Sequence, residues 1–181
     1  MRSLNPDKRI AVLAGTVFSF DQISKLIVVK GLGMELQMER EVIPGFFRLV
    51  HWGNTGAAWS RFDGRNNILA IVALLAVGLL VWKRHLFETH RLGGQVALGL
   101  ILGGICGNLL DRLRVGHVID FLRFYVERRG VDQAGMDFEA GFPAFNIADS
   151  AICIGVVVLF ILSFEIGRHP ANSSQTPKTS A

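Results

Sequence analysis

Four long apolar runs constrain the fold of this chain more than any other feature. They cover about residues 10–29, 67–82, 94–113 and 148–166. A helix needs about 20 apolar residues to cross a bilayer, and it satisfies its own backbone hydrogen bonds there. Half of the 181 residues are hydrophobic, which is more than a soluble domain of this size can bury. The runs therefore predict a single membrane domain over residues 1–181 with four transmembrane helices.

The order of the runs also predicts an orientation. An even number of spans places both termini on one side of the membrane. The loop at residues 83–93 lies on that side, and short basic loops of this kind stay in the cytoplasm. We therefore expect cytoplasmic termini, with longer segments at about 30–66 and 114–147 on the outer face. The tail at about 169–181 is rich in Ser and Thr and is expected to be disordered.

The first outer segment has the pattern of a small antiparallel β-sheet over about residues 35–62. Its β-forming residues are interrupted by turn signals at Pro44-Gly45 and at residues 54–56. The sheet would be extracytoplasmic and would lie on the membrane surface. Aromatic side chains favour the level of the lipid headgroups. Those expected there are Phe46, Phe47, Trp52, Trp59 and Phe62.

Charge and cysteine usage exclude other classes of protein. The net charge is +4, but Lys and Arg flank the apolar runs and few aromatic residues interleave with them, which does not indicate nucleic-acid binding. Cys106 and Cys153 both lie inside apolar runs, where a thiol acts as a packing residue. The spacing of Cys and His matches no metal-binding pattern. We therefore expect no metal site.

Two aspartates, Asp120 and Asp149, each lie in a polar cluster at the end of an apolar run. One extramembrane segment separates them, so both carboxylates belong to the same face of the membrane. A charged group at the hydrocarbon boundary costs up to about 3 kcal/mol, which makes a functional role the first hypothesis. Two carboxylates brought close together share one proton, so that one acts as general base and the other as general acid. Asp120 has apolar neighbours and is the readier acid, whereas a helix start makes Asp149 the readier base.

Other polar residues are predicted to lie near this pair. Asn108 and Arg112 are one helical turn apart and share a face, and Asp111 could pair with its neighbour Arg112. Asn146 and Asp149 have the spacing of a helix N-cap, and capping alone is an alternative explanation for them.

Two further patterns lie within the spans. Asp21 and Lys25 form an i, i+4 pair, for which an intrahelical ion pair is as good an explanation as a role in support of the site. Small residues at Gly99, Gly103 and Gly107 make a stripe that lets another helix approach closely.

Five motifs, taken together, resemble bacterial lipoprotein signal peptidase, the signal peptidase II family. They read DQISK at residues 21–25, NTGAA at 54–58, GNLLDR at 107–112, VIDF at 118–121 and FNIADS at 145–150. Each motif alone is weak, but five in this order over four apolar spans are specific. The resemblance covers about residues 10–167.

The resemblance implies an integral membrane aspartic protease of the bacterial inner membrane, active near the periplasmic face. The family removes the signal peptide from prolipoproteins, just before a cysteine that carries diacylglycerol. It implies that Asp120 and Asp149 are the catalytic dyad. The residues that it implies for substrate binding or support are Asn54, Gly56, Asn108, Arg112, Asn146, Asp21, Lys25 and Asp111.

The resemblance carries further expectations. It implies no cofactor, a monomer that contacts membrane lipids, and inhibition by globomycin-type cyclic peptides. It also implies a periplasmic loop or helix over the active site, within residues 114–147. That region is enlarged here at about 126–143 by a polar insert.

Two other classes of function remain as alternatives. A small transporter would use Asp21, Asp111, Asp120 and Asp149 as a proton relay, which requires ionisable groups spread through the depth of the bilayer. An assembly protein would use the glycine stripe as its interface, but it gives no reason for two Asn-associated aspartates on one face.

Overall fold

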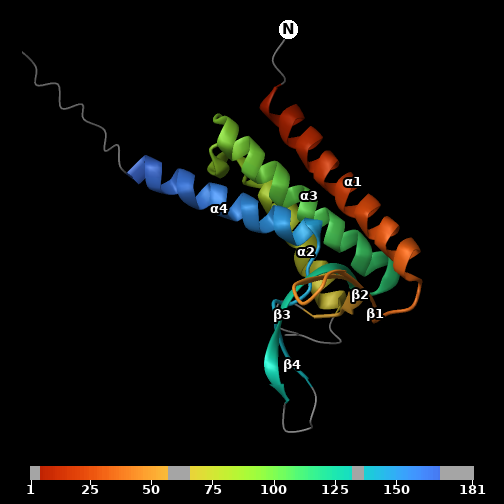
Figure 1. The fold of residues 1–181 in the computed structure, drawn as a ribbon. Helices are drawn as coiled ribbons and strands as arrows, with labels where there is room; N and C mark the ends of the chain where they lie inside the picture. Colours follow the sequence, from red (N-terminus) through yellow and green to blue (C-terminus); the bar gives the residue numbers. More distant parts are fainter. Residues whose placement is uncertain (1–4, 57–65, 132–136, 168–181) are drawn as a thin grey trace, which may run out of the picture.

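The described part of the chain forms four α-helices with a four-stranded sheet at one end of them (Figure 1). The computed structural model describes residues 5–56, 66–131 and 137–167. In chain order, these residues form α1 (Pro6–Leu32), β1 (Met38–Ile43), β2 (Phe47–Asn54), α2 (Asn66–Trp82), the short 3₁₀ helix η2 (Arg84–Phe87), α3 (Leu92–Val115), β3 (Val118–Val131), β4 (Asp137–Gly141) and α4 (Ile147–Gly167).

Three of the described helices are long and apolar enough to cross a membrane, namely α1, α3 and α4. At 1.5 Å per residue, the 27 residues of α1 extend about 40 Å, which exceeds the hydrocarbon core of a bilayer. Helix α2 is also apolar but has 17 residues, fewer than any of these three. The sequence analysis predicted four spans, and the structure supports three of them by length and composition.

Helix α3 lies at the centre of the helical part, between α1 and α4 (Figure 1). In an apolar 18-residue stretch of α3, 56 % of the residues are buried inside the protein, against 17 % in the corresponding stretches of α1 and α4. The outer helices instead expose large apolar side chains, such as Phe20 of α1, Leu75 of α2 and Phe160 of α4. Such an arrangement is stable when lipid covers the outer faces.

Glycines on α3 allow its neighbours to approach closely. A Cβ atom at Gly103 would lie 2.6 Å from the carbonyl oxygen of Ala14 on α1, and one at Gly104 would lie 2.4 Å from that of Ala148 on α4. The predicted stripe of Gly99, Gly103 and Gly107 faces α1, as a helix-packing interface requires. Two different faces of α3 therefore hold α1 and α4 in close contact.

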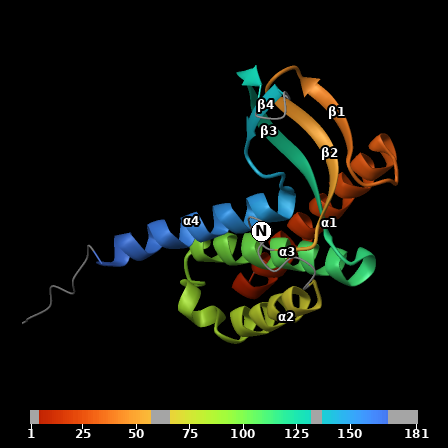
Figure 2. The same cartoon turned by 90° about the horizontal axis from the view of Figure 1, so that it is seen from below.

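The sheet is antiparallel throughout, with the order β1-β2-β3-β4, and β2 and β3 run side by side in Figure 2. The predicted sheet in residues 35–62 is confirmed for β1 and β2, but half of the strands come from the second outer segment. Where a loop or helix over the active site was expected, the described residues form β3 and β4 instead. Strand β3 begins soon after α3 ends, because Gly116 adopts a left-handed conformation with φ of 80° and turns the chain.

Some sequence predictions concern residues outside the described ranges. These are Trp59, Phe62, the centre of the polar insert at 132–136 and the tail at 169–181. Of the predicted aromatic residues, Phe46 and Phe47 lie beside Phe124, with ring centroids 5.6 and 4.9 Å from its own, whereas the ring of Trp52 lies under the guanidinium of Arg123. Their position at the lipid headgroups stays a prediction.

Candidate active site

The two predicted aspartates meet at one buried asparagine. The Nδ2 of Asn146 donates a hydrogen bond of 2.8 Å to Oδ1 of Asp120. The Oδ1 of Asn146 accepts one of 2.9 Å from the backbone N–H of Asp149, and the backbone N–H of Asn146 donates to Oδ2 of Asp149 at 3.2 Å. This reciprocal pair is a capping box at the start of α4. The capping explanation and the proximity of the aspartates are therefore both correct, because one side chain does both.

Backbone hydrogen bonds hold the two clusters at fixed positions. Asp120 lies near the start of β3, and Asp149 lies in the first turn of α4. The carbonyl oxygen of Phe145, one residue before Asn146, accepts from the N–H groups of Phe121 and Leu122 at 3.1 and 2.9 Å. The N–H of Phe145 donates back to the carbonyl of Leu122 at 3.0 Å. The entry to α4 is thus pinned to β3 directly beside Asp120.

Each carboxylate has a second asparagine as a partner. The Nδ2 of Asn54, at the end of β2, donates to Oδ2 of Asp120 at 3.0 Å. The Nδ2 of Asn108, on α3, donates to Oδ1 of Asp149 at 2.7 Å. Asp120 is only 3 % exposed. Both oxygens of each carboxylate are therefore oriented by neutral donors, which leaves the pair free to carry a proton.

The environment of Asp120 favours its protonated form. Burial, followed by the negative charge of Asp149, raises the pKa of Asp120 from its ordinary value of 3.8 to about 7. The hydrogen bonds from Asn54 and Asn146 and the charge of Lys25 act in the opposite direction and are weaker. A carboxyl group with this pKa is able to donate a proton near neutral pH.

Arg112 lies at the edge of this group, and its guanidinium makes two long contacts there. Its Nη1 is 3.4 Å from the carbonyl oxygen of Asn108, and its Nη2 is 3.5 Å from that of Gly56. Its Nε is buried without a hydrogen-bond partner in the described part of the chain. Of the predicted supporting residues, Asn54, Gly56, Asn108, Arg112 and Asn146 are therefore gathered around the two aspartates.

The predicted pairing of Asp111 with Arg112 is wrong. The carboxylate of Asp111 binds the ammonium of Lys25 at 2.6 Å. Neighbouring residues on a helix point about 100° apart, so adjacent charges do not face each other. Lys25 also binds Asp21 at 2.8 Å, as the i, i+4 spacing predicted.

Gln22 also belongs to this group, although it was not among the predicted site residues. Its amide donates to Oδ1 of Asp111 at 2.9 Å and to the carbonyl oxygen of Gly107 at 3.2 Å. Its place in the DQISK motif was a signal in the sequence, but that place does not predict a contact with another helix.

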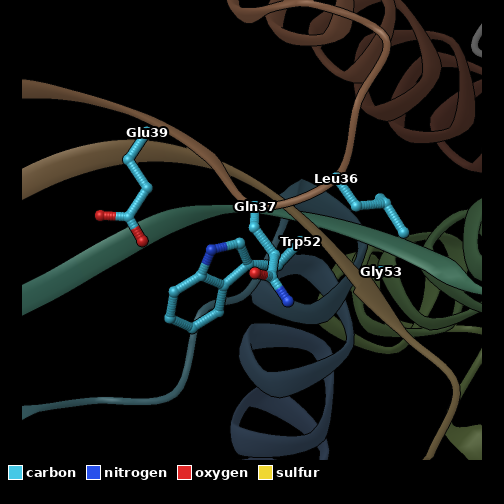
Figure 3. A pocket seen from close by; sticks show the side chains of 5 residues that line it. All are labelled: Leu36, Gln37, Glu39, Trp52 and Gly53. Carbon is cyan, nitrogen blue, oxygen red and sulfur yellow. The ribbon is translucent and has the colours of Figure 1, made fainter.

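The described residues also line an open pocket of about 450 Å³ on the sheet (Figure 3). The residues that line it are Leu36, Gln37, Glu39, Trp52 and Gly53. Neither aspartate is among them, so we place the candidate site at Asp120 and Asp149 and not in this pocket. Elsewhere in the described residues, no group of three or more His, Cys, Asp or Glu side chains is arranged to hold a metal ion.

Apolar spanning helices, with two buried carboxylates where they meet an extramembrane sheet, define an integral membrane protein with a polar site at one face. The family model described as "Signal peptidase (SPase) II" matches residues 13–165. The chain belongs to the signal peptidase II family.

Individual relatives agree with this assignment. A lipoprotein signal peptidase of Symbiobacterium thermophilum is 40 % identical over 151 residues, which cover 83 % of this chain and 90 % of that protein. One of Syntrophotalea carbinolica is 36 % identical over 168 residues, which cover 90 % and 96 %.

Two solved structures share the fold, and both are described as bacterial membrane enzymes studied by the in meso method. The one at 2.3 Å resolution has a TM-score of 0.69 and 30 % identity and covers 94 % of each chain. The one at 1.9 Å resolution has a TM-score of 0.66 and 32 % identity, and covers 86 % of this chain and 92 % of the other.

Proposed function

We propose that this protein is an aspartic endopeptidase that removes the signal peptide from diacylglyceryl-modified prolipoproteins, cleaving before the lipidated cysteine. Family membership supports the removal of signal peptides from prolipoproteins. The aspartic mechanism rests on one observation, which is that Asn146 joins the buried carboxylates of Asp120 and Asp149. Asp120 and Asp149 are the catalytic residues of the proposal.

The proposed reaction uses one shared proton. Asp149 takes a proton from a water molecule, whose oxygen attacks the scissile carbonyl carbon, while protonated Asp120 donates a hydrogen bond to the carbonyl oxygen. Asp120 then passes its proton to the leaving nitrogen, the C–N bond breaks, and the carbonyl re-forms as the new carboxyl group. The dyad again holds one proton, now on Asp149. Asp149 is the base because the positive end of α4 favours negative charge in its first turn.

The remaining polar residues have supporting roles in this proposal. Asn54, Asn108 and Asn146 orient the carboxylates. Arg112, with its long contacts beside Gly56, is placed to bind carbonyl oxygens of the substrate backbone. A cyclic peptide of the globomycin type would occupy the same positions, and a monomer contains every residue that the reaction uses.

The proposed topology has four spans in the bacterial inner membrane. Helix α2 extends about 25 Å, and a bilayer adapts to a slightly short span by thinning. In Figure 1 the start of α1, the link between α2 and α3, and the end of α4 all lie away from the sheet. We assign that end to the cytoplasm, because the link is short and basic. The site then lies near the periplasmic face, where a substrate arrives through the bilayer and still meets water.

A proton relay across the membrane has less support. It requires acids at several depths, but Asp21 accepts from the N–H of Ala148 and Asp111 accepts from that of Ile119. All four acids therefore gather at the end of the helices next to the sheet.

The test is cleavage of a diacylglyceryl-modified prolipoprotein by the purified protein in detergent, measured by gel shift. We expect cleavage before the lipidated cysteine by the wild type, and none by folded Asp120→Asn or Asp149→Asn. Asp7→Asn, at the opposite end of α1, is the control and is expected to cleave normally. Cleavage that survives in either dyad variant would refute the dyad, and an inactive, folded wild type would refute the function.

A further inference from the structure

A buried ion cluster lies beside the dyad and has Lys25 at its centre. The Nζ of Lys25 is 2.8 Å from Asp21, 2.6 Å from Asp111 and 3.1 Å from Oδ1 of Asn108. The side chain of Lys25 is 2 % exposed, and those of Asp21 and Asp111 are 0 % and 3 % exposed. The ammonium therefore uses its three donors on three acceptors, from two helices, without contact with solvent.

The two anions of this cluster hold the backbone directly before each catalytic residue. Oδ1 of Asp21 accepts 2.9 Å from the N–H of Ala148, which precedes Asp149. Oδ2 of Asp111 accepts 3.2 Å from the N–H of Ile119, which precedes Asp120. One ammonium thus pairs with both carboxylates that fix the main chain at the dyad.

A third connection runs from Lys25 to a catalytic side chain. Because Lys25 donates to Oδ1 of Asn108, the amide of Asn108 is fixed with its Nδ2 toward Asp149. An amide without that contact is free to rotate by 180° and to present its oxygen to the carboxylate. Lys25 therefore determines which end of Asn108 meets Asp149.

Stability alone does not explain this cluster. Removing charges from water costs about as much as a buried ion pair returns, and apolar residues of the same volume are often at least as stable. A buried charged network is instead suited to holding groups in one geometry. The contacts here converge on the residues beside the dyad, from α1, α3, β3 and α4.

We propose that Lys25 is a positioning residue for proteolysis, which acts through Asn108 on the carboxylate of Asp149 and through Asp21 and Asp111 on the backbone beside both aspartates. The proposal rests on the proposed function, because it assigns Lys25 to that same site. Lys25 does not touch the substrate. It governs the rate of the chemical step and not the binding of the prolipoprotein.

The test must separate the loss of the contacts that Lys25 makes from the loss of charge balance in the buried cluster. Lys25→Met alone leaves two buried carboxylates without a cation and is expected to unfold. Asp21→Asn with Lys25→Met removes one charge of each sign, and the new amide oxygen still accepts from Ala148. We expect this double variant to melt near the wild-type temperature, with KM within about twofold and kcat lower by about 10- to 100-fold. Lys25→Met with Asp111→Asn is a second charge-matched pair, in case the first does not fold.

A double-mutant cycle with Asn108→Ala shows whether the loss runs through Asn108. If it does, the charge-matched pair lowers kcat by less than about twofold once Asn108 is absent. Arg84→Gln, in the exposed ion pair with Asp7, is the control for charge removal and is expected to keep wild-type kcat.

Each outcome has a distinct meaning. A wild-type kcat in a folded charge-matched variant would overturn the positioning role alone. Losses that multiply with Asn108→Ala would overturn the route through Asn108 and assign the loss to the backbone contacts of Asp21 and Asp111. Cleavage by Asp120→Asn or Asp149→Asn in the same experiment would overturn the proposed function itself.

Discussion

Asp120→Asn is expected to make the protein more stable above pH 7, although it removes a proposed catalytic group. In the folded protein the pKa of Asp120 is about 7, against an ordinary value of 3.8. A difference of about three pH units corresponds to about 4 kcal/mol. Because the folded state binds this proton more tightly than the unfolded state, stability is highest below about pH 4 and falls as the pH rises through about 7.

Asparagine does not ionise, so the variant does not lose stability in this window. Its amide nitrogen, however, replaces an oxygen that accepts from Asn54 or Asn146. The loss of one such hydrogen bond costs about 1–2 kcal/mol. The net expectation is a gain of about 2 kcal/mol at pH 8 and almost none at pH 5.

Thermal unfolding in one detergent at pH 5 and pH 8 measures this difference. For a chain of this length, 1 kcal/mol shifts Tm by about 2–4 °C, so the variant should melt about 4–8 °C above the wild type at pH 8. Asp7→Asn is the control, because this carboxylate is mostly exposed and pairs with Arg84. If the wild type and Asp120→Asn gave parallel curves of Tm against pH, the statement that burial raises the pKa of Asp120 would be refuted.

Two further substitutions test the local architecture. Asn146→Ala should destabilise the protein by about 2–4 kcal/mol, because it removes a helix cap and a hydrogen bond to a buried carboxyl group. Asn146→Ser should restore the cap but not the cleavage rate. Normal cleavage by the serine variant would show that Asn146 only caps α4. Gly104→Ala should lower both Tm and the cleavage rate, because its Cβ would lie 2.4 Å from the carbonyl oxygen of Ala148. Gly15→Ala on α1 is the matched control, since its Cβ meets nothing within 4 Å, and this change should raise Tm slightly. Equal effects of the two changes would contradict the close packing of α3 and α4.

The helices were the most predictable part of the fold, because hydrophobic length is a local property of the sequence. The run at 67–82 shows the limit of this signal, since its helix is apolar but two to three residues short of the usual span. The strands after α3 were missed, although Val118, Phe121, Tyr125 and Val126 are strong β-formers. The resemblance to the family implied a loop or helix there, against the local β-propensity of these residues.

The site was predictable where its residues are neighbours in sequence. The capping spacing of Asn146 and Asp149, and the helical spacing of Asp21 and Lys25, gave correct local pairs. The bond between Lys25 and Asp111 was not predictable, because it depends on which face of α3 meets α1. The glycine stripe indicated a close contact on that face but did not name the partner helix.

Gly107 on α3 constrains how the sequence of α1 can change during evolution. A Cβ atom at this position would lie 2.5 Å from Oδ2 of Asp21, the oxygen that binds Lys25. The room for the buried acid therefore exists only where α3 has no side chain. An ancestor that gained any larger residue at 107 would have had to give up the carboxylate at 21. A lineage can therefore change position 21 while Gly107 stays, but a larger residue at 107 requires a change at 21 first or at the same time.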